Sequence, residues 1–523
     1  MASAGIVAVI AAAAAALIWN HTTKARTARL PPGPPSYPLL GQLPSVPTSF
    51  EQLKYKALTD DLKSDIISLQ FLGKTIVVLG SSQAAIDLFE KRSTIYSDRP
   101  QNIILTDKRL IDWENAVPFT QYGERLRTYR RIFSTWLGKT ATKAFHEHQV
   151  TQVRRMLRRF AGFRNRTISS DVIEKQLHRL TTSTLLHAAY GYEVNSMNDQ
   201  FVILAKRAVD IASQIVLPSN FLVNVFPSLL RVPEWVPGTG WRRLVRGWRT
   251  ELRRTIEEPF EWAKGQMAAG IAQNSLVCSV LESLSKPGEN AAFDLTEEDC
   301  KEVAVAIFGG GSDTMAGTLM AFILAMALFP EAQAMAQREI DSVIGISRLP
   351  EISDVENLPY VRSLIQEVMR WRPALPLGIP HASSQDDVFQ GYEIPKGSII
   401  YLLAAGSIGN IWAMTRDVKL YQDPETFNPN RFLDPSVPPP PIFGWGRRKC
   451  PGMYFAESLV FVCIASILAG FNIKSSGETQ DHELHFDIPA NGIIYRPKPF
   501  SCIIEPRSQA HEELIHAATY ENM

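Results

Sequence analysis

Long amphipathic patterns with helical spacing dominate the chain beyond residue 125 and leave little room for a fold that is not largely helical. Apolar residues recur there at intervals of three and four, and the patterns are longer than strands usually are. We expect helices over the following segments: Arg125–Leu137, His146–Phe160, Asp171–Ala189, Asp199–Val216, Trp241–Met267, Thr296–Leu328 and Pro330–Val343.

Strand signals are few and short. The apolar runs Ile66–Leu69 and Thr75–Leu79 are joined through Gly73 and fit a hairpin, and Ser82–Lys91 after them has helical spacing. The sequence shows no internal repeat and no interior stretch with linker composition, so we expect one large domain over 41–506, mainly α with a minor β-sheet. Further strand signals lie at Ser398–Leu403, Gly492–Ile494 and Ser501–Ile504.

The N-terminus has the composition of a membrane anchor. Residues 1–20 carry no charge, and the apolar run Gly5–Trp19 is at the short end of the roughly 17–25 residues that cross a bilayer. Basic residues follow from Lys24 onward, whereas the first acidic residue is Glu51, which places the body on the cytoplasmic side. A cleaved signal peptide is the alternative, but its positive leading region is missing.

These observations divide the chain. We expect a transmembrane anchor over 1–20, a basic and proline-rich linker over 21–40 that proline stiffens, and a solvated C-terminal tail over 507–523.

The formal net charge of +1 argues against nucleic acid as a partner. The five cysteines form no CxxC pair, which argues against a zinc ribbon and a disulfide framework and favours a reducing, intracellular setting.

The segment Phe443–Gly452, FGWGRRKCPG, contains the most informative cysteine, Cys450. Glycines at 444, 446 and 452 let the backbone approach a large flat ligand closely. Pro451 suits the first turn of a helix, which the apolar run Met453–Gly470 supplies, and a helix N-terminus stabilises a thiolate. An isolated cysteine in a basic loop is usually a structural or reactive thiol, but the whole segment fits the pattern FxxGxRxCxG.

With that pattern the chain resembles the cytochrome P-450 family of haem-thiolate monooxygenases. The resemblance implies that Cys450 is the axial ligand of the haem iron and that Arg448 meets a haem propionate. It also places Phe443, Gly446 and Gly452 in the haem-binding loop. A thiolate ligand pushes electron density towards iron and favours cleavage of dioxygen.

Two further motifs occur in the order that the family has. Glu367 and Arg370 match its ExxR motif, and their spacing lets them pair on one helix face, although most such pairs are solvated surface bridges. Phe427–Phe432 resembles the meander, whose arginine, here Arg431, joins that pair. Asn430 stands where the family usually has an acidic residue.

The expected helix Thr296–Leu328 contains three successive glycines, Gly309–Gly311, followed by Asp313 and Thr314. Each glycine costs about 1 kcal/mol in a helix interior. Close helix packing would explain small residues but not the adjoining Asp-Thr pair. By resemblance the helix is distorted there to admit dioxygen, and Asp313 and Thr314 relay protons. Met315 replaces a second hydroxyl residue of the family pattern.

Two residues match positions that meet haem propionates in the family. Arg130 occupies the arginine position of a WxxxR helix whose tryptophan is replaced by Leu126. His381, in Ile379–Ala382, matches a propionate-binding histidine, although a lone histidine is more often an ordinary surface or core residue.

The resemblance implies an enzyme that contains haem b and inserts one oxygen atom from O2 into a lipophilic small molecule. Its electrons come from NADPH through a cytochrome P-450 reductase, with a cytochrome b-type protein as a second donor. The loop sequence around Pro233–Gly238 resembles that of fungal microsomal family members that act in secondary metabolism. This resemblance implies that the protein is located in the endoplasmic reticulum membrane and acts on a terpenoid or polyketide-type substrate. Basic residues for docking the reductase are Arg125, Arg127, Arg131, Arg447 and Lys449.

Two other functions remain open at this point. One is a haem-thiolate isomerase or dehydratase that needs no reductase, and the other is a non-catalytic membrane haem sensor or carrier. The Asp313–Thr314 pair and the glycine run speak against both. The segments expected to line the substrate pocket contain no ionisable residue, which favours a neutral substrate: Ile103–Leu105, Phe221–Phe226, Ala304–Gly310, Leu375–Ile379 and Gly492–Ile494.

Overall fold

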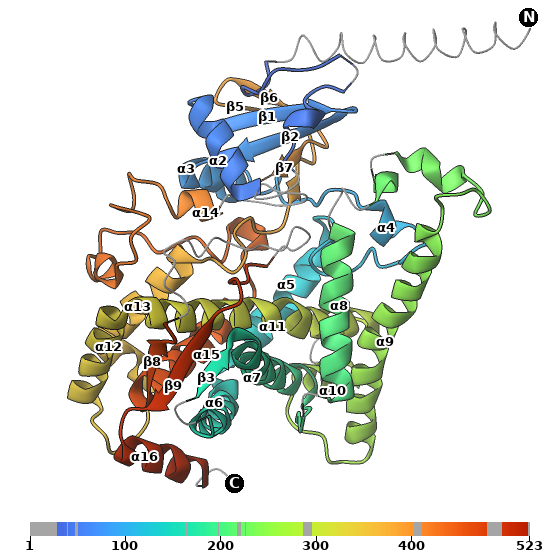
Figure 1. Cartoon of the computed structure of the whole chain (residues 1–523). Helices are drawn as coiled ribbons and strands as arrows, with labels where there is room; N and C mark the ends of the chain where they lie inside the picture. The colour runs from blue at the N-terminus through green and yellow to red at the C-terminus, as the bar shows by residue number, and fades with distance from the viewer. Residues whose placement is uncertain are drawn as a thin grey trace, which may run out of the picture. The chain divides into compact units, whose positions relative to one another are not determined.

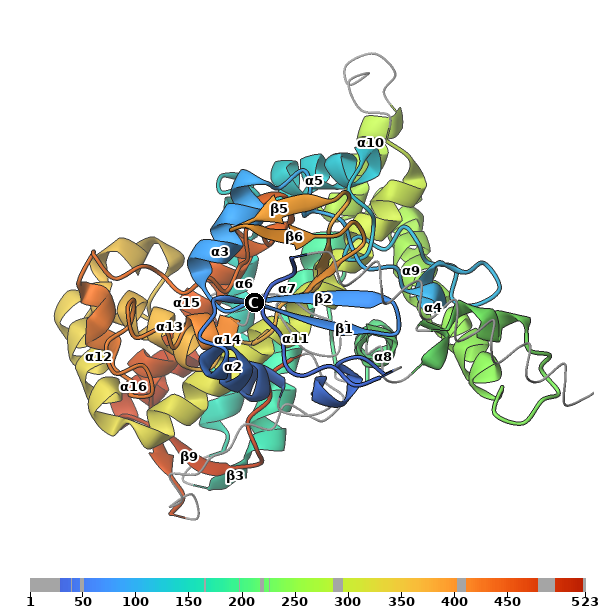
Figure 2. The same ribbon diagram turned by 90° about the horizontal axis from the view of Figure 1, so that it is seen from above.

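The structure is a computed structural model that describes residues 29–38, 40–47, 51–163, 166–196, 198–216, 221–224, 226–285, 295–401, 411–477 and 494–520. The expected anchor over 1–20 lies outside these residues. The described chain is mainly helical with small sheets, as the sequence predicts (Figures 1 and 2). It divides into two compact units that are discontinuous in sequence. The smaller unit is Met1–Pro100, Leu377–Ala413 and Trp445–Arg447, and the larger is Gln101–Pro376, Met414–Gly444 and Arg448–Met523.

The smaller unit contains a four-stranded sheet in the order β1-β2-β7-β4. The predicted hairpin is present, and its turn puts Leu72 and Gly73 at φ of 48° and 76°, which matches the right-handed twist of the strands. β7 runs parallel to β2 and antiparallel to β4. The strands are β1 (Ile66–Phe71), β2 (Lys74–Leu79), β7 (Ile399–Tyr401) and β4 (His381–Ala382), with β5 (Asp387–Phe389) and β6 (Tyr392–Ile394) forming a separate pair.

Helices of the smaller unit are short. The predicted helix Ser82–Lys91 is an α-helix, α3 (Ser82–Ile86), that continues as a wider π-type turn over Asp87–Lys91. The helix α2 (Glu51–Asp61) has a weak apolar face and was not expected from the sequence. Its Tyr55 nevertheless packs into a core with apolar residues of the sheet, Ile67, Leu69, Ile76 and Val78.

The larger unit contains the long helices, whose ends agree with the sequence predictions to within one or two residues. Their apolar stripes pack into one extended hydrophobic core. The helices of this unit are α4 (Ile103–Thr106), α5 (Glu124–Leu137), α6 (His146–Ala161), α7 (Ser170–Tyr190), α8 (Gln200–Val216), α9 (Trp241–Ala268), α10 (Leu276–Ser285), α11 (Glu297–Leu328), α12 (Pro330–Val343), α13 (Pro359–Trp371), α15 (Met453–Gly470) and α16 (Gln509–Tyr520), while α14 (Ile411–Met414) begins in the smaller unit.

Two of these helices, α11 and α15, lie at the centre of the core. Thr296 caps α11 by accepting a hydrogen bond from the Asp299 amide at 3.1 Å, while the Asp299 carboxylate accepts one from the Thr296 amide. Both helices are long and apolar enough to cross a membrane, but 78% of each apolar window is buried inside the protein. They therefore serve as core helices, and α11 lies against α7 for much of its length (Figure 1).

The C-terminal tail is the clearest departure from the sequence prediction. Residues 509–520 form α16, which packs on α6 and α15 and is not a solvated extension. Apolar positions are sparse in this segment, which predicts a solvated tail, yet Ile515 is 1% exposed and contacts the core. A three-stranded sheet in the order β3-β9-β8 precedes it: β3 (Thr167–Ser169), β9 (Ser501–Pro506) and β8 (Phe471–Ser475).

Candidate functional site

A buried ion network in the larger unit joins α13 to the segment that follows Phe427. Glu367 and Arg370 are both 0% exposed and pair through two contacts, Nε–Oε2 at 2.7 Å and Nη2–Oε1 at 2.8 Å. Arg431 adds Nε–Oε2 at 3.0 Å, and the Asn428 amide donates to Glu367 Oε1 at 2.7 Å. The predicted triad is therefore assembled, and the surface-bridge alternative is wrong.

The remaining donors of this network go to backbone carbonyls, which a buried guanidinium requires. Arg370 donates to the carbonyls of Thr415 at 2.9 Å and Pro424 at 2.7 Å. Arg416, which the sequence did not single out, donates to the Trp371 carbonyl at 2.8 Å. These carbonyl contacts join α13 to the irregular chain that follows α14.

Cys450 lies three residues before the start of α15, in a loop of irregular backbone. Its amide donates to the Phe443 carbonyl at 2.8 Å, which closes the loop into a turn. The helix itself begins at Met453 with Gly452 as N-cap, so Cys450 precedes the first turn that the sequence predicted for it. The thiol is free and exposed.

Two opposing effects act on that thiol. The protein surrounds it closely enough that desolvation raises its pKa, which is the larger effect, while the Gly452 amide, Arg130 and Lys449 lower the pKa. The sequence-based expectation of a stabilised thiolate is therefore only partly met by the protein's own groups.

Two arginines hold the loop from the same unit. The Arg130 guanidinium on α5 donates to the Lys449 carbonyl at 2.5 Å, and Arg448 donates to the Thr120 carbonyl. Burial lowers the pKa of Arg130, and Cys450 partly offsets that effect. Leu126, in the place of the family's tryptophan, is 2% exposed and packs in the core, so it supplies no polar group.

The smaller unit carries two of the predicted residues. His381 on β4 is 6% exposed, and its Nδ1 lies 2.5 Å from the Tyr96 carbonyl, while its ring contacts Phe89 with centroids 4.3 Å apart. Gly446 has φ of 55°, and a Cβ there would clash with the Phe89 carbonyl oxygen. Gly446 is thus explained by backbone contact within this unit.

One face of the middle of α11 is open, although most of the helix is buried. Gly310 is exposed and Thr314, four residues on, is half-buried, whereas Ser312, Asp313 and Met315 are buried. A Cβ on Gly309 or Gly310 would meet no atom within 4 Å. The α-helix continues through the glycines without the distortion that the family resemblance implied. The Thr314 hydroxyl donates to the Gly310 and Gly311 carbonyls at 3.0 and 3.2 Å.

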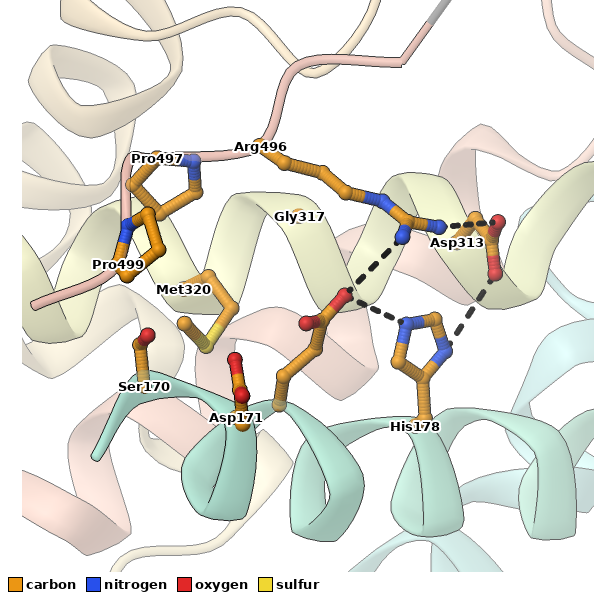
Figure 3. A pocket seen from close by; sticks show the side chains of 10 residues that line it. Ser170, Asp171, His178, Asp313, Gly317, Met320, Arg496, Pro497 and Pro499 are labelled. Carbon is orange, nitrogen blue, oxygen red and sulfur yellow. Dashed lines mark hydrogen bonds and ion pairs between the residues drawn. The ribbon is translucent and has the colours of Figure 1, made fainter. Parts of the chain in front are cut away.

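Asp313 points away from that open face into a small pocket of about 90 Å³ (Figure 3). Its carboxylate lies 3.4 Å from His178 Nδ1 on α7 and 3.4 Å from Arg496 Nη2. Neither His178 nor Arg496 was expected from the sequence, because neither belongs to a motif and their partners are distant in the chain.

A second histidine cluster within the described residues has the composition of a metal site. His148, His187 and Glu193 place their ligand atoms within 4.8 Å of one another. The rings of His148 and His187 stack 3.6 Å apart at an angle of 4°, so their in-plane lone pairs are parallel and do not converge on one ion. His187 Nδ1 lies 3.0 Å from Glu193, and burial with the neighbouring His187 lowers the pKa of His148 to about 4. The cluster is a local ion-paired contact.

The groups of the larger unit fit a haem. A free, accessible thiol supplies an iron ligand, and Arg130 and Arg448 are cations suited to carboxylates. A Cβ on Gly444 or Gly452 beside the thiol would meet no atom within 4 Å, so this part of the loop leaves room for a flat group. These features define a haem protein whose iron is held by a cysteine thiolate.

Comparisons with known proteins agree with that class. The family model described as Cytochrome P450 matches residues 31–504, so the chain belongs to the cytochrome P450 family. Cytochrome P450 monooxygenase 208 of Postia placenta is 37% identical over 498 residues, covering 93% of this chain and 92% of that protein. A cytochrome P450 monooxygenase of Armillaria gallica is 35% identical, covering 93% of each, and monooxygenase COX2 of Coprinopsis cinerea is 34% identical, covering 94% and 92%. The protein is a cytochrome P450 monooxygenase.

Proposed function

We propose that this monooxygenase inserts one oxygen atom from O2 into a neutral, lipophilic scaffold of terpenoid or polyketide type, with NADPH-derived electrons from a separate reductase. The main support is that one compact unit contains both Cys450 and the open α11 face with Gly310 and Thr314. The thiolate-ligated haem b supplies the activation of dioxygen. Cys450 holds the iron, and Thr314 moves a proton from its hydroxyl.

The carboxylates of the cofactor need cationic or hydrogen-bonding partners. Arg130 and Arg448 in the larger unit and His381 in the smaller unit are the side chains proposed to bind them. Each is held by a backbone carbonyl, so the side chain is positioned before the haem arrives. This positioning lowers the entropic cost of binding the propionates.

The character of the substrate is supported by a separate hydrophobic cluster in the larger unit. It gathers Ile104 and Leu105 of α4 with Phe221 and Val223, all buried, and with apolar residues of α8 and α9. An ionised substrate would lose its hydration here without gaining a partner charge. Of the three charges nearest in sequence, Asp107 and Arg109 pair with each other at 2.7 Å, so the exposed Lys108 is the remaining charge of this segment.

The proposed reductase docks on the exposed basic residues of α5. Arg125, Arg127 and Arg131 are exposed on this helix, and Glu124 is the acidic residue paired with two of them, at 2.6 and 3.5 Å. A basic excess therefore remains. Such a face accelerates association with an acidic partner, and a cytochrome b-type donor would use the same complementarity.

The proposed location is the endoplasmic reticulum membrane, with a single pass over 1–20, a linker over 21–40 and the catalytic domain in the cytoplasm. The uncharged N-terminus and the basic residues after it support this arrangement. Deleting residues 1–20 should release much of the protein from membranes and leave its haem spectrum intact. Loss of haem on deletion would contradict a separate anchor.

The function is tested by reconstituting the full chain with haem, reductase and NADPH under ¹⁸O2, with a panel of neutral terpenoid and polyketide-type compounds. The proposal expects a product that contains one ¹⁸O atom and does not form when the reductase is omitted. A product formed without NADPH would favour the isomerase or dehydratase. Ligand binding without any product from the panel would favour the sensor or carrier.

A further inference from the structure

The pocket beside Asp313 is lined on three sides by groups that carry or exchange protons. α7 contributes Asp171, Glu174 and His178, α11 contributes Asp313, and the C-terminal segment contributes Arg496 (Figure 3). The pocket lies on the side of α11 that Asp313 faces. Thr314 follows by one residue, so its side chain is turned about 100° around the helix axis towards the open face.

His178 bridges two carboxylates with its two ring nitrogens. Nδ1 lies 3.4 Å from Asp313 Oδ1, and Nε2 lies 3.4 Å from Glu174 Oε1. Arg496 closes the ring from the other side, with Nη2 3.4 Å from Asp313 and Nη1 3.7 Å from Glu174. The imidazole is therefore the only group in this ring of contacts that can accept a proton on one atom and release one from another.

Exposure of the side chains falls steadily towards Asp313. Arg496 is 41% exposed, Glu174 29%, His178 22% and Asp313 9%, so Glu174 and Arg496 form the solvent side and Asp313 the inner end. The hydrogen bond from His178, with Arg496 and Lys206, lowers the pKa of Glu174 against the opposing effect of burial. Glu174 is thus an ionised acceptor beside the imidazole.

We propose that His178 carries protons from the pocket to Asp313, the acid of the proposed Asp313–Thr314 pair. This inference rests on the proposed monooxygenase function. An incoming proton from pocket water binds Nε2, the proton on Nδ1 passes to Asp313 Oδ1, and the ring is left neutral with its proton on Nε2. Exchange with water or a ring flip restores the first tautomer. His178 acts through Asp313 and does not itself touch the reacting atoms.

A purely structural role is the rival explanation, because the same contacts join α7 to α11. His178→Gln separates the two, since glutamine keeps a donor and an acceptor but cannot pass a proton at neutral pH. In the holoenzyme with reductase, the relay predicts that the product formed per NADPH falls on the order of tenfold, with the balance released as hydrogen peroxide. It also predicts that this ratio no longer changes with pH between about 5.5 and 7.5, the range in which histidine titrates. An unchanged ratio and pH profile would overturn the proposal.

A second measurement needs neither substrate nor reductase. In full-length holoprotein labelled with ¹³C-histidine, the ring tautomer of His178 is followed by NMR and assigned by its absence in His178→Gln. The contact of His178 Nδ1 with the Asp313 carboxylate predicts that Asp313→Asn reduces the share of the tautomer with its proton on Nδ1, because a charged acceptor is lost. A tautomer ratio that does not change would contradict the relay, even if the monooxygenase function holds.

The matched control is His516→Gln on α16. His516 also lies near a carboxylate, 4.0 Å from Glu512, but it is 43% exposed and outside the pocket. It should leave the product ratio, its pH profile and the ring tautomer of His178 unchanged. A tenfold fall in this control would mean that the loss in His178→Gln is not specific to the pocket, and the proposal would fail.

Discussion

Cys450 depends on its iron for ionisation more than its position in the sequence suggests. Desolvation raises the pKa of its thiol, and the Gly452 amide, Arg130 and Lys449 offset that effect only in part. A metal ligand replaces the proton on sulfur, so binding of haem and release of that proton are coupled. Burial by the protein raises the pKa of the thiol, and a bound iron would supply charge that stabilises the thiolate.

Cys450→Ser should abolish the red-shifted absorption band that the reduced carbon monoxide complex of a thiolate-ligated haem shows. Serine is nearly isosteric but cannot supply the same ligand field. The measurement is a difference spectrum of the reduced protein with and without carbon monoxide. Cys463→Ser, at a buried cysteine on α15, is the control and should keep the band if the variant folds. A wild-type band in Cys450→Ser would refute the assignment of the ligand.

At the scale of elements, the network around Glu367 is expected to hold the irregular chain before Cys450. Arg370→Met should destabilise the protein by roughly 3–5 kcal/mol, because it leaves a buried carboxylate with fewer partners. Arg431→Met should cost less, since Arg370 still binds Glu367 through two contacts. Urea unfolding curves give both values.

The control for this network lies on the same helix. Arg362 pairs with Glu356 at 2.6 Å, but the two side chains are 42% and 78% exposed. Arg362→Met should therefore change stability by less than about 1 kcal/mol. If Arg362→Met and Arg370→Met lower the free energy of unfolding equally, burial of the Glu367 network adds nothing to stability.

The helix α16 is expected to be part of the fold. Ile515→Ala should lower the free energy of unfolding by about 2–5 kcal/mol, because Ile515 is buried and its removal leaves a cavity against Gly470. The exposed neighbour Glu513→Ala is the control and should lie within about 0.5 kcal/mol of wild type. If both variants match wild type in thermal unfolding, the helix contributes nothing to stability.

At the scale of the whole molecule, a buried acid on α11 links stability to pH. Burial raises the pKa of Glu302 to about 7, although the Trp113 indole donates to its carboxylate at 2.8 and 2.9 Å. The unfolded chain releases this proton near pH 4.5, so the stabilisation from the protonated acid is present below that pH and lost as pH rises towards 7.

Glu302→Gln should therefore be more stable than wild type at pH 8, by up to roughly 3 kcal/mol, and similar to wild type at pH 4.5. Glutamine still offers the indole an acceptor without a charge. Denaturant unfolding at both pH values measures the difference, with Glu298→Gln, whose side chain on the same helix is 56% exposed, as the matched control. A pH-independent difference would be evidence against titration of Glu302.

Much of the site could be predicted from local sequence. The Cys450 loop, the Glu367–Arg370 pair with Arg431, and the Asp313–Thr314 pair each lie within a few residues of their motif. The helices that carry them are long enough for apolar spacing to define their ends. The propionate-binding roles of Arg130, Arg448 and His381 stay predictions. The structure shows that each of these side chains contacts a backbone carbonyl.

By itself the sequence determined the helices and the family and predicted the iron-binding cysteine, because these depend on periodicity and on residues that are close along the chain. Only the tertiary structure decided what surrounds them. The two units combine segments far apart in sequence, α16 docks through one buried isoleucine, and Asp313 meets His178 and Arg496 from separate segments. Contacts of this kind arise from packing between elements, and no local pattern records which distant side chain packing will bring to a buried charge.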